Sequence, residues 1–274
     1  MIKELKESEF YKCKELLNEN GQLEAKAIVE GINPGRIFVD DMESPASGLI
    51  WLGNNDGFIF IGNERNDEFN TGLNHLIDTV IAPDANKVGL IWFEGVGNHP
   101  QWNATIEKVL ANRRLGSWNQ RVYTLQKDDY KAGCKPAIEE GYKIVQISEI
   151  FNDKQITNID FLHAKIAAYW ASSESFFQRG AGYCVVHQNK IVSVCFSGFV
   201  VEPFHCVDIE TLEEHRGKKL AQLAANAFVE DCLNHNFVPY WDCMESNKPS
   251  IAVAENIGFK NVFNYIGYEF KFEV

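Results

Sequence analysis

Apolar positions along the chain switch between helical and extended spacing, and the two spacings follow one another in a similar order twice. In the first half, helical patterns precede three short strand patterns, and helix and strand then alternate. A polar run at 54–57 predicts a turn between the second and third strands. We predict helices from Ser8 and around 23–31, strands at 36–40, 48–52 and 57–61, a helix at 68–80, a strand at 87–94, a helix after Pro100 and a strand at 120–125.

The second half repeats this order of elements without repeating the sequence. We predict a strand at 142–147, a long helix at 158–171, strands at 183–187, 191–200 and 204–210, a helix ending near His235, a strand at 238–243, a helix at 248–257 closed by Gly258, and a strand at 265–272. The pattern indicates an α+β fold class, with a mixed α/β sheet in each half.

The length and one polar segment indicate two domains. At 274 residues the chain exceeds the common size of a single domain, and each half is long enough to bury a core. We predict an N-terminal domain at 1–126, a linker at 127–135 and a C-terminal domain at 136–274.

Composition narrows the classes of function. Acidic residues outnumber basic ones by 38 to 26, giving a formal charge of −12, which argues against a broad nucleic-acid footprint. We expect no signal peptide, because no apolar core follows the charged start, and no apolar run is long enough to span a membrane. The seven cysteines form no Cys-x-x-Cys pair and the histidines are scattered. We therefore predict a cytoplasmic protein with no metal and no partner membrane or nucleic acid.

The first informative stretch lies where the strand at 204–210 ends and a helix begins. Backbone N–H groups at such a helix start lack partners and lie at the positive end of the helix dipole, which favours a phosphate or pyrophosphate. Basic side chains add local charge, and small residues leave the backbone accessible. A solvated basic helix start, neutralised by the two preceding glutamates, is the alternative. The segment reads Arg216, Gly217, Lys218, Lys219, Leu220 and Ala221.

A second stretch runs from Asn247 through Ser250 to Gly258 and Phe259, one helix and one strand further on. Together the two stretches resemble the pyrophosphate loop and the later Asn-x-x-Ser … Gly-Phe helix of the GNAT superfamily of N-acetyltransferases. Lys219 stands where that family has its central glycine. A narrower resemblance, to the zwittermicin A resistance type of acetyltransferase, rests on Trp170, Ser173, Phe176, Asp208, Ile209, Thr211, Trp241, Asp242 and Cys243.

The resemblance implies tandem GNAT-like domains, with acetyl-CoA in the splayed sheet of the C-terminal one. The N-terminal copy is expected to be degenerate, because the acidic segment 62–68 replaces its phosphate loop. Ala254 stands where many family members have a tyrosine that protonates the leaving sulfur. The expected cofactor-binding residues are Val207, Ile209, Arg216, Gly217, Lys218, Lys219, Leu220, Ala221, Asn247 and Ser250.

Acetylation of an amine needs a group that takes a proton, since a free alkylamine has a pKa of about 10.4. The candidate catalytic residues are His205, Glu202 and Glu210, with Asp208 as a further rival. His205 falls where some family members place a catalytic glutamate. Alternation puts His205 on one face of its strand and the carboxylates of Asp208 and Glu210 on the other.

The expected acceptor side of the site precedes the sheet. In the resembling fold this region lines the substrate pocket, so Trp170, Ser173 and Phe176 are the predicted substrate residues, together with Asp242. Packing of these aromatic residues in the core is the competing interpretation. The acidic residues nearby favour a cationic amine.

These observations predict an N-acetyltransferase that moves an acetyl group from acetyl-CoA to a primary amine of a small molecule, by direct attack in a ternary complex. Two alternatives to this prediction stay open. One is a sensor or scaffold that binds acetyl-CoA without turnover, and the other is a related N-acyltransferase that uses another acyl-CoA. A structural module without a CoA site would require both motifs to be coincidental.

Overall fold

The computed structural model describes residues 1–54 and 57–272. It divides into two compact units, unit 1 at Met1–Gln120 with Tyr265–Val274, and unit 2 at Arg121–Asn264. Each unit has its own buried core. The turn predicted at 54–57 includes Asn55 and Asp56, which lie outside the described residues.

Unit 1 contains a sheet in the order β1-β2-β3-β4-β5-β12. The pairs β2/β3 and β3/β4 are antiparallel, and β4/β5 is parallel because a helical run connects them. The elements up to this point are β1 (Lys3–Glu4), η1 (Glu7–Leu16), α1 (Leu23–Val29), β2 (Gly35–Val39), β3 (Ser47–Leu52), β4 (Phe58–Gly62), α2 (Asp67–Leu76), η2 (Ile77–Ile81), α3 (Ala82–Lys87), β5 (Trp92–Gly97), α4 (Trp102–Val109) and β6 (Gly116–Thr124).

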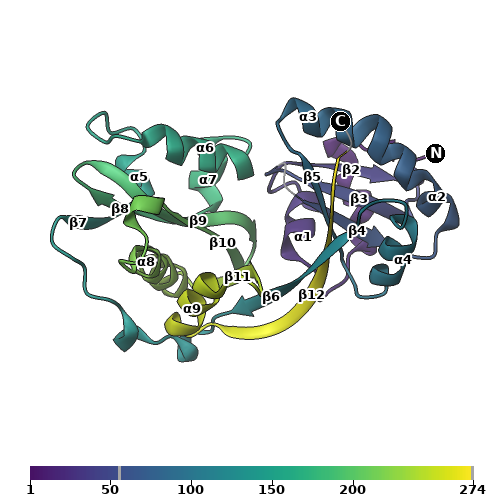
Figure 1. Ribbon diagram of the computed structural model, residues 1–274. Helices are drawn as coiled ribbons and strands as arrows, with labels where there is room; N and C mark the ends of the chain where they lie inside the picture. Colours follow the sequence, from purple (N-terminus) through teal and green to yellow (C-terminus); the bar gives the residue numbers. More distant parts are fainter. Residues whose placement is uncertain (55–56, 273–274) are drawn as a thin grey trace. The chain divides into compact units, whose positions relative to one another are not determined.

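Unit 2 repeats this order, with the strands β11-β10-β9-β8-β7 side by side. Three antiparallel pairs are followed by a parallel pair, β10/β11, across the helix α8. Figure 1 shows α6 and α7 on one side of this sheet and α8 and α9 on the other. The remaining elements are η3 (Lys127–Asp129), η4 (Ala132–Cys134), β7 (Tyr142–Gln146), α5 (Ile147–Ile150), α6 (Ile159–Tyr169), α7 (Ser173–Arg179), β8 (Gly182–His187), β9 (Lys190–Val201), β10 (Phe204–Thr211), η5 (Glu213–His215), α8 (Leu220–Asn234), β11 (Val238–Met244), α9 (Lys248–Ile257) and β12 (Lys260–Lys271).

The predicted mixed α/β fold in tandem copies is therefore confirmed, and several predicted boundaries differ. The strand expected at 87–94 begins only at Trp92, because the helical run continues through α3 to Lys87 and a turn at Gly89 follows. The first helix is of the 3-10 type, and α7 was not predicted as a separate helix.

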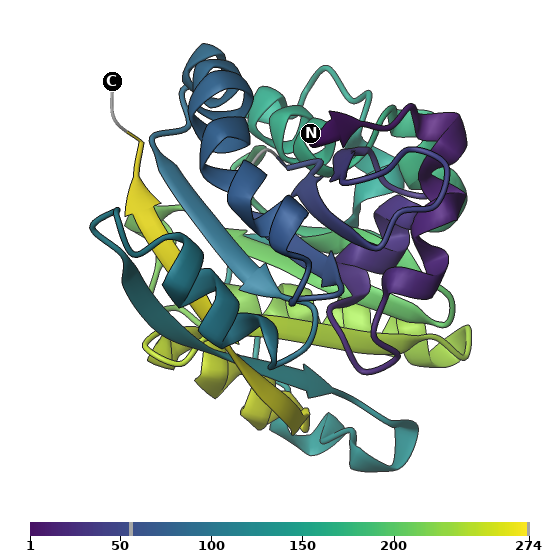
Figure 2. The same ribbon diagram turned by 90° about the vertical axis from the view of Figure 1, so that its right-hand side faces the viewer.

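The division of the chain also differs from the expected ranges 1–126, 127–135 and 136–274. Residues 127–135 lie in unit 2, where the N–H of Lys131 bonds to the carbonyl of Ile257 at 2.8 Å. Residues 265–274 belong to unit 1, because the end of β12 pairs with β5 from Gly267↔Val96 to Lys271↔Trp92. Figure 2 shows the yellow β12 running along β5.

Helix α8 positions the loop that precedes it. Its buried face is rich in small residues, and Ala224 and Ala225 are fully buried. Small side chains let the helix lie close to the sheet, while Phe228 and Val229 fill the core beneath it. No helix among the described residues is both long and apolar enough to cross a membrane.

Phe270 tests the role of the C-terminal strand in unit 1. Its ring stacks on Phe93 at 4.8 Å between centroids and is 1% exposed. Phe270→Ala removes this packing, so we expect unit 1 to lose about 3–5 kcal/mol of unfolding free energy. Hydrogen exchange would show faster exchange in β3 and β4, with β8 and β9 unchanged. The matched control is Lys271→Ala, an exposed position of the same strand. Equal exchange in both variants would contradict the assignment of this strand to the core of unit 1.

Candidate active site

The two central strands of unit 2 pair over only part of their length. Strands β10 and β11 are joined by three residue pairs, from Phe204↔Val238 to Cys206↔Tyr240. Directly after this point the β9/β10 register shifts by one residue, between Cys206 and Val207. Such a bulge bends the strand and increases its twist. Beyond it, no further pair among the described residues joins β10 to β11, and Ile209 and Trp241 line one cavity.

This cavity has a volume of about 730 Å³. Its wall is mostly apolar, and it extends from the end of β10 past the start of α8 to β11 and α9. A pocket of this size and composition is typical of a small-molecule or cofactor site. Its lining consists of Ile209, Glu210, Thr211, His215, Arg216, Gly217, Lys219, Leu220, Ala221, Gln222, Trp241, Asn247, Pro249, Ser250, Ala252, Val253 and Asn256.

The loop before α8 presents backbone donors to the cavity. Gly217 has φ +81° and Lys219, the N-cap residue, has φ +60°. Lys219 therefore adopts the left-handed conformation that suits a glycine, as expected where the family has one. No side chain among the described residues caps the helix at Lys219. The first N–H groups of α8 thus remain available at the positive end of the helix dipole.

The corresponding helix of unit 1 begins differently. The side chain of Asn66 accepts a hydrogen bond from the N–H of Phe69 at 3.2 Å, and two carboxylates, Asp67 and Glu68, occupy the first turn of α2. Strand β5 ends at Gly97, its last pair with β4, and the N–H of Asn98 bonds to the carbonyl of Phe60 at 2.8 Å. Strand β11 by contrast continues past its last pair with β10, and the start of α8 lacks the side-chain cap that α2 has.

Most of the expected cofactor residues meet at the cavity. Ile209, Arg216, Gly217, Lys219, Leu220, Ala221, Asn247 and Ser250 all line it. Val207 instead packs against the core of unit 2. The Lys218 ammonium points to Tyr142 and donates to its hydroxyl at 2.9 Å. Sequence spacing could not tell which lysine of the pair faces the cavity.

Asn247 and Ser250 fix the far wall through local hydrogen bonds. The Asn247 side chain accepts from the Ser250 N–H at 3.2 Å and caps α9. The Ser250 hydroxyl accepts from Trp241 Nε1 at 3.0 Å, which holds the buried indole in the wall. Ala254 is fully buried in the core on the next turn of α9.

The three predicted catalytic residues are not brought together. Glu202 is exposed and lies between β9 and β10. His205 is 1% exposed, its Nδ1 lies 2.8 Å from the Ser197 hydroxyl, and its ring packs against Phe237 at 4.4 Å. Glu210 lines the cavity. Of the three, Glu210 alone is part of the cavity wall.

The face of β10 toward α6 carries a cluster of polar side chains. The sequence pattern pointed to Asp208 and Glu210 in this cluster, but not to Lys165 and Tyr169 of α6. Asp208 accepts a hydrogen bond from Tyr169 at 2.9 Å, and Glu210 forms an ion pair with Lys165. Oδ2 of Asp208 is buried with no hydrogen-bond partner among the described residues. Burial raises the pKa of Asp208, although Lys165 and Tyr169 act against this shift. The i,i+4 spacing of Lys165 and Tyr169 was the sequence signal for a shared helix face.

Gly198 makes room for this group. A Cβ at Gly198 would lie 3.1 Å from the Tyr169 ring and 3.6 Å from Cβ of Asp208. The missing side chain lets the Tyr169 ring approach β9 next to Asp208. The bulge and this glycine therefore position the Asp208 carboxylate where β10 leaves its partner strand.

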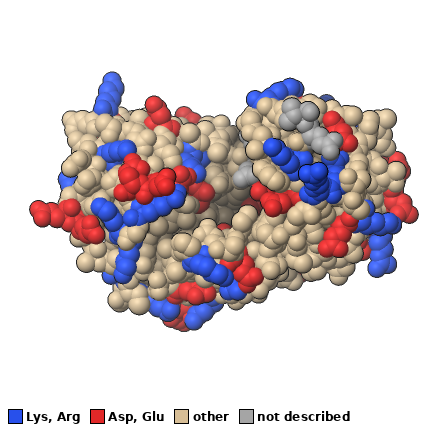
Figure 3. Space-filling view, in the orientation of Figure 1, with Lys and Arg blue, Asp and Glu red and all other residues tan. Residues whose placement is uncertain are grey.

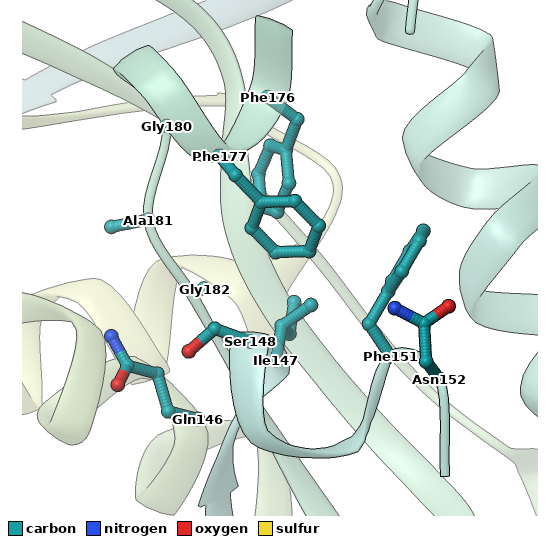
Figure 4. A pocket seen from close by; sticks show the side chains of 10 residues that line it. All are labelled: Gln146, Ile147, Ser148, Phe151, Asn152, Phe176, Phe177, Gly180, Ala181 and Gly182. Carbon is teal, nitrogen blue, oxygen red and sulfur yellow. The ribbon is translucent and has the colours of Figure 1, made fainter. Parts of the chain in front are cut away.

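The predicted substrate residues are scattered. Trp170 is buried and donates from Nε1 to the carbonyl of Ser197 at 2.8 Å. Ser173 is the first residue of α7. Asp242 directly follows Trp241 in β11, so the two side chains point to opposite faces of the strand. Phe176 lines a second cavity of about 480 Å³ near the start of β8. Figure 4 shows the rings of Phe151, Phe176 and Phe177 grouped there, with Gln146 set apart.

Charge around the site is local. On the face drawn in Figure 3, acidic and basic side chains are interspersed, with no continuous basic field on that face. A polyanion would thus depend on short-range donors in the loop rather than on the overall field. No group of three His, Cys, Asp or Glu side chains within the described residues is placed to hold a metal ion.

Comparison with known proteins agrees with this geometry. A GNAT acetyltransferase family model matches residues 14–268, so the chain belongs to the GNAT acetyltransferase family. The predicted acetyltransferase class is thereby confirmed. Members of this family generally use acetyl-CoA.

A curated relative and two solved structures resemble the chain over most of its length. An uncharacterized N-acetyltransferase, YdfB of Bacillus subtilis (strain 168), is 29% identical over 243 residues, 88% of either chain. A GCN5-related N-acetyltransferase-like protein from Streptococcus suis has a TM-score of 0.69 at 20% identity, covering 96% of this chain and 98% of the other. A tandem GNAT protein from the clavulanic acid biosynthesis pathway has a TM-score of 0.59 at 13% identity, with coverages of 99% and 98%. At these identities the structures show the fold.

His205 predicts a pH dependence of stability. Burial lowers its pKa to about 4 from the ordinary 6.5, so the folded state holds the ring neutral while the unfolded state takes up a proton. The stability that the neutral ring contributes is complete above pH 6.5 and is lost as the pH falls to about 4, by about 3 kcal/mol. Denaturant unfolding of wild type and His205→Gln from pH 7 to 4 measures the difference. Parallel pH profiles would show that His205 does not titrate in this way.

Proposed function

We propose that this protein transfers an acetyl group from acetyl-CoA to a primary amine of a small molecule, by direct attack in a ternary complex. The observation that carries the proposal is the uncapped start of α8 beside the cavity between β10 and β11. Its backbone donors suit the pyrophosphate of acetyl-CoA. The apolar wall of Ile209, Trp241 and Leu220 suits the aliphatic parts of the pantetheine arm. When bound, acetyl-CoA supplies an activated acyl thioester.

The loop would hold the anionic part of the cofactor. Arg216, Gly217 and Lys219 line the cavity beside the N–H groups of Leu220 and Ala221. Arg216 is oriented by a hydrogen bond from Nε to the Thr211 carbonyl at 3.2 Å. Because Lys219 already has the glycine-like conformation, its side chain replaces no backbone donor, and its ammonium adds charge.

Asp208 is the proposed proton acceptor for the attacking amine. Its burial and raised pKa make it a better base than an exposed carboxylate, and Tyr169 holds its Oδ1. Oδ2 is buried without a hydrogen-bond partner among the described residues, so it is the oxygen left to take the proton. Glu210, paired with Lys165, would contribute to attraction of a cationic acceptor. Glu202 and His205 remain candidates from the sequence, with less geometric support.

Narrower parts of the proposal rest on the sequence resemblance. They are the zwittermicin A resistance type of activity and the acceptor-side roles of Trp170, Ser173, Phe176 and Asp242. The proposed cytoplasmic location rests instead on the cysteine pattern. The degenerate character of unit 1 is supported by its capped α2 and by the pairing of β5 with β4 as far as the end of β5. Binding of acetyl-CoA without turnover would favour the sensor or scaffold. A preference for another acyl-CoA would favour the related N-acyltransferase.

Gly217→Asp tests the cofactor site. The variant places a carboxylate among the proposed pyrophosphate donors, so we expect calorimetry to show affinity for acetyl-CoA reduced by about tenfold or more, at least 1.4 kcal/mol. Gly89→Asp is the matched control, because Gly89 and Gly217 have φ +77° and +81° and neither Cβ would meet an atom within 4 Å. Equal affinities in the two variants would argue against this loop. Absence of binding to folded wild type would refute the proposed function.

Asp208→Asn tests the proton acceptor. The amide keeps the shape of the side chain but cannot accept the amine proton, so we expect kcat to fall about 10²–10⁴-fold with acetyl-CoA affinity unchanged. Thiol release with a panel of amines measures the rate. Glu202→Gln and His205→Gln are assayed alongside. Full activity of Asp208→Asn with a loss in either comparison variant would move the proton acceptor to that residue.

A further inference from the structure

Four side chains meet beside the proposed phosphate loop, and only Lys218 of the four is among the cofactor-binding residues expected from the sequence. Tyr142 begins β7, His187 ends β8, His215 ends η5, and Lys218 lies in the loop. The Tyr142 hydroxyl lies 3.0 Å from Nδ1 of His215 and accepts from the Lys218 ammonium at 2.9 Å. The Tyr142 and His187 rings stack at 4.4 Å between centroids.

These contacts fit two arrangements of the protons. An ammonium group can only donate, so the Tyr142 oxygen accepts from Lys218. With His215 neutral and its ring proton on Nε2, Nδ1 accepts the hydroxyl proton of Tyr142. With His215 protonated, Nδ1–H donates to the same oxygen, which has a second lone pair.

The charged groups around His215 favour the neutral form. Burial is the largest cause that lowers its pKa, and His187 of β8, Lys218 of the loop and Lys190 of β9 act in the same direction. Glu214 acts against them, but its carboxylate is already paired with Lys190 at 3.0 Å. An added negative charge would reverse the balance.

His215 also lines the cavity, next to Arg216 and Gly217. His187 does not form part of the described cavity wall. A polyanion held by the loop would thus place its charge near one of the two imidazoles. This gives a direct link between occupancy of the loop and the charge on His215.

We propose that His215 is a proton-linked anion-binding residue, so that a polyanion bound at the loop draws a proton from solvent onto Nδ1 of His215. This inference rests on the proposed cofactor site. The proton balance is simple: the buffer releases one proton, and imidazole becomes imidazolium. Nδ1–H then donates to the Tyr142 oxygen, which still accepts from Lys218, and the tyrosine hydrogen turns elsewhere. Tyr142 and Lys218 are positioning residues.

Calorimetric titration with coenzyme A tests the linkage. Binding is measured between pH 6 and 8 in PIPES and in imidazole, two phosphate-free buffers whose ionisation enthalpies differ, so that the difference reports protons taken up. We expect wild type to take up about 0.5–1 proton near neutral pH, and its affinity to rise by up to about tenfold per pH unit as the pH falls. The free ligand has a phosphate that titrates near pH 6, and the variants below correct for it.

His215→Gln should still bind coenzyme A but lose the protein's share of the uptake, while His187→Gln keeps it. Binding by wild type with no uptake beyond that of His215→Gln would overturn the inference and leave the proposed function intact. If His215→Gln does not fold, the wild type and His187→Gln still test the inference. An affinity for coenzyme A that does not change with pH, after correction for titration of the ligand's phosphate, overturns it. Absence of any binding by folded wild type would overturn both proposals.

Discussion

The separation of β10 from β11 is the constraint on which the rest of unit 2 depends. Three residue pairs hold the two strands together as far as Cys206 and Tyr240. The bulge between β9 and β10 follows directly after Cys206. Two parallel strands that stayed paired would fill the space now lined by Ile209 and Trp241. The opened strands leave backbone groups that a sheet would otherwise satisfy, and a buried polar backbone needs water or a ligand in its place. The cavity is thus a consequence of the strand geometry.

The two units meet the same requirement in different ways. A helix start leaves several N–H groups without intrahelical partners. In unit 1 the Asn66 side chain satisfies one of them and the acidic first turn balances the helix dipole. Its strands β4 and β5 are also joined through their side chains, with Phe58 stacked on Phe93 at 4.4 Å in the core. In unit 2 the N-cap is a left-handed Lys219 without a side-chain cap. One order of elements therefore gives a closed copy and an open one.

The sequence predicted the elements whose signals are local. The glycine-containing loop and the Asn247-to-Ser250 cap depend on backbone geometry and short-range hydrogen bonds, and both lie where the motifs indicated. The start of β5 was missed, because the apolar residues 88–91 fit a strand as well as the end of a helical run. The affiliation of 265–274 was missed because pairing partners of a strand are non-local. His205 does share a strand face with Ile209, but periodicity says nothing of depth along the strand, and His205 lies at the paired end.

The opened strands also separate two kinds of charge. On the α8 side, the helix start and the basic loop offer donors, and His215 can add charge when an anion arrives. On the α6 side, β10 presents the carboxylates of Asp208 and Glu210. A sheet alternates its side chains between faces, so one strand can serve both. Because the chain carries a formal charge of −12, a polyanion gains nothing from the long-range field. Its recognition must come from donors within hydrogen-bond reach, which is why the backbone conformation at Gly217 and Lys219 matters more than the number of basic side chains around it.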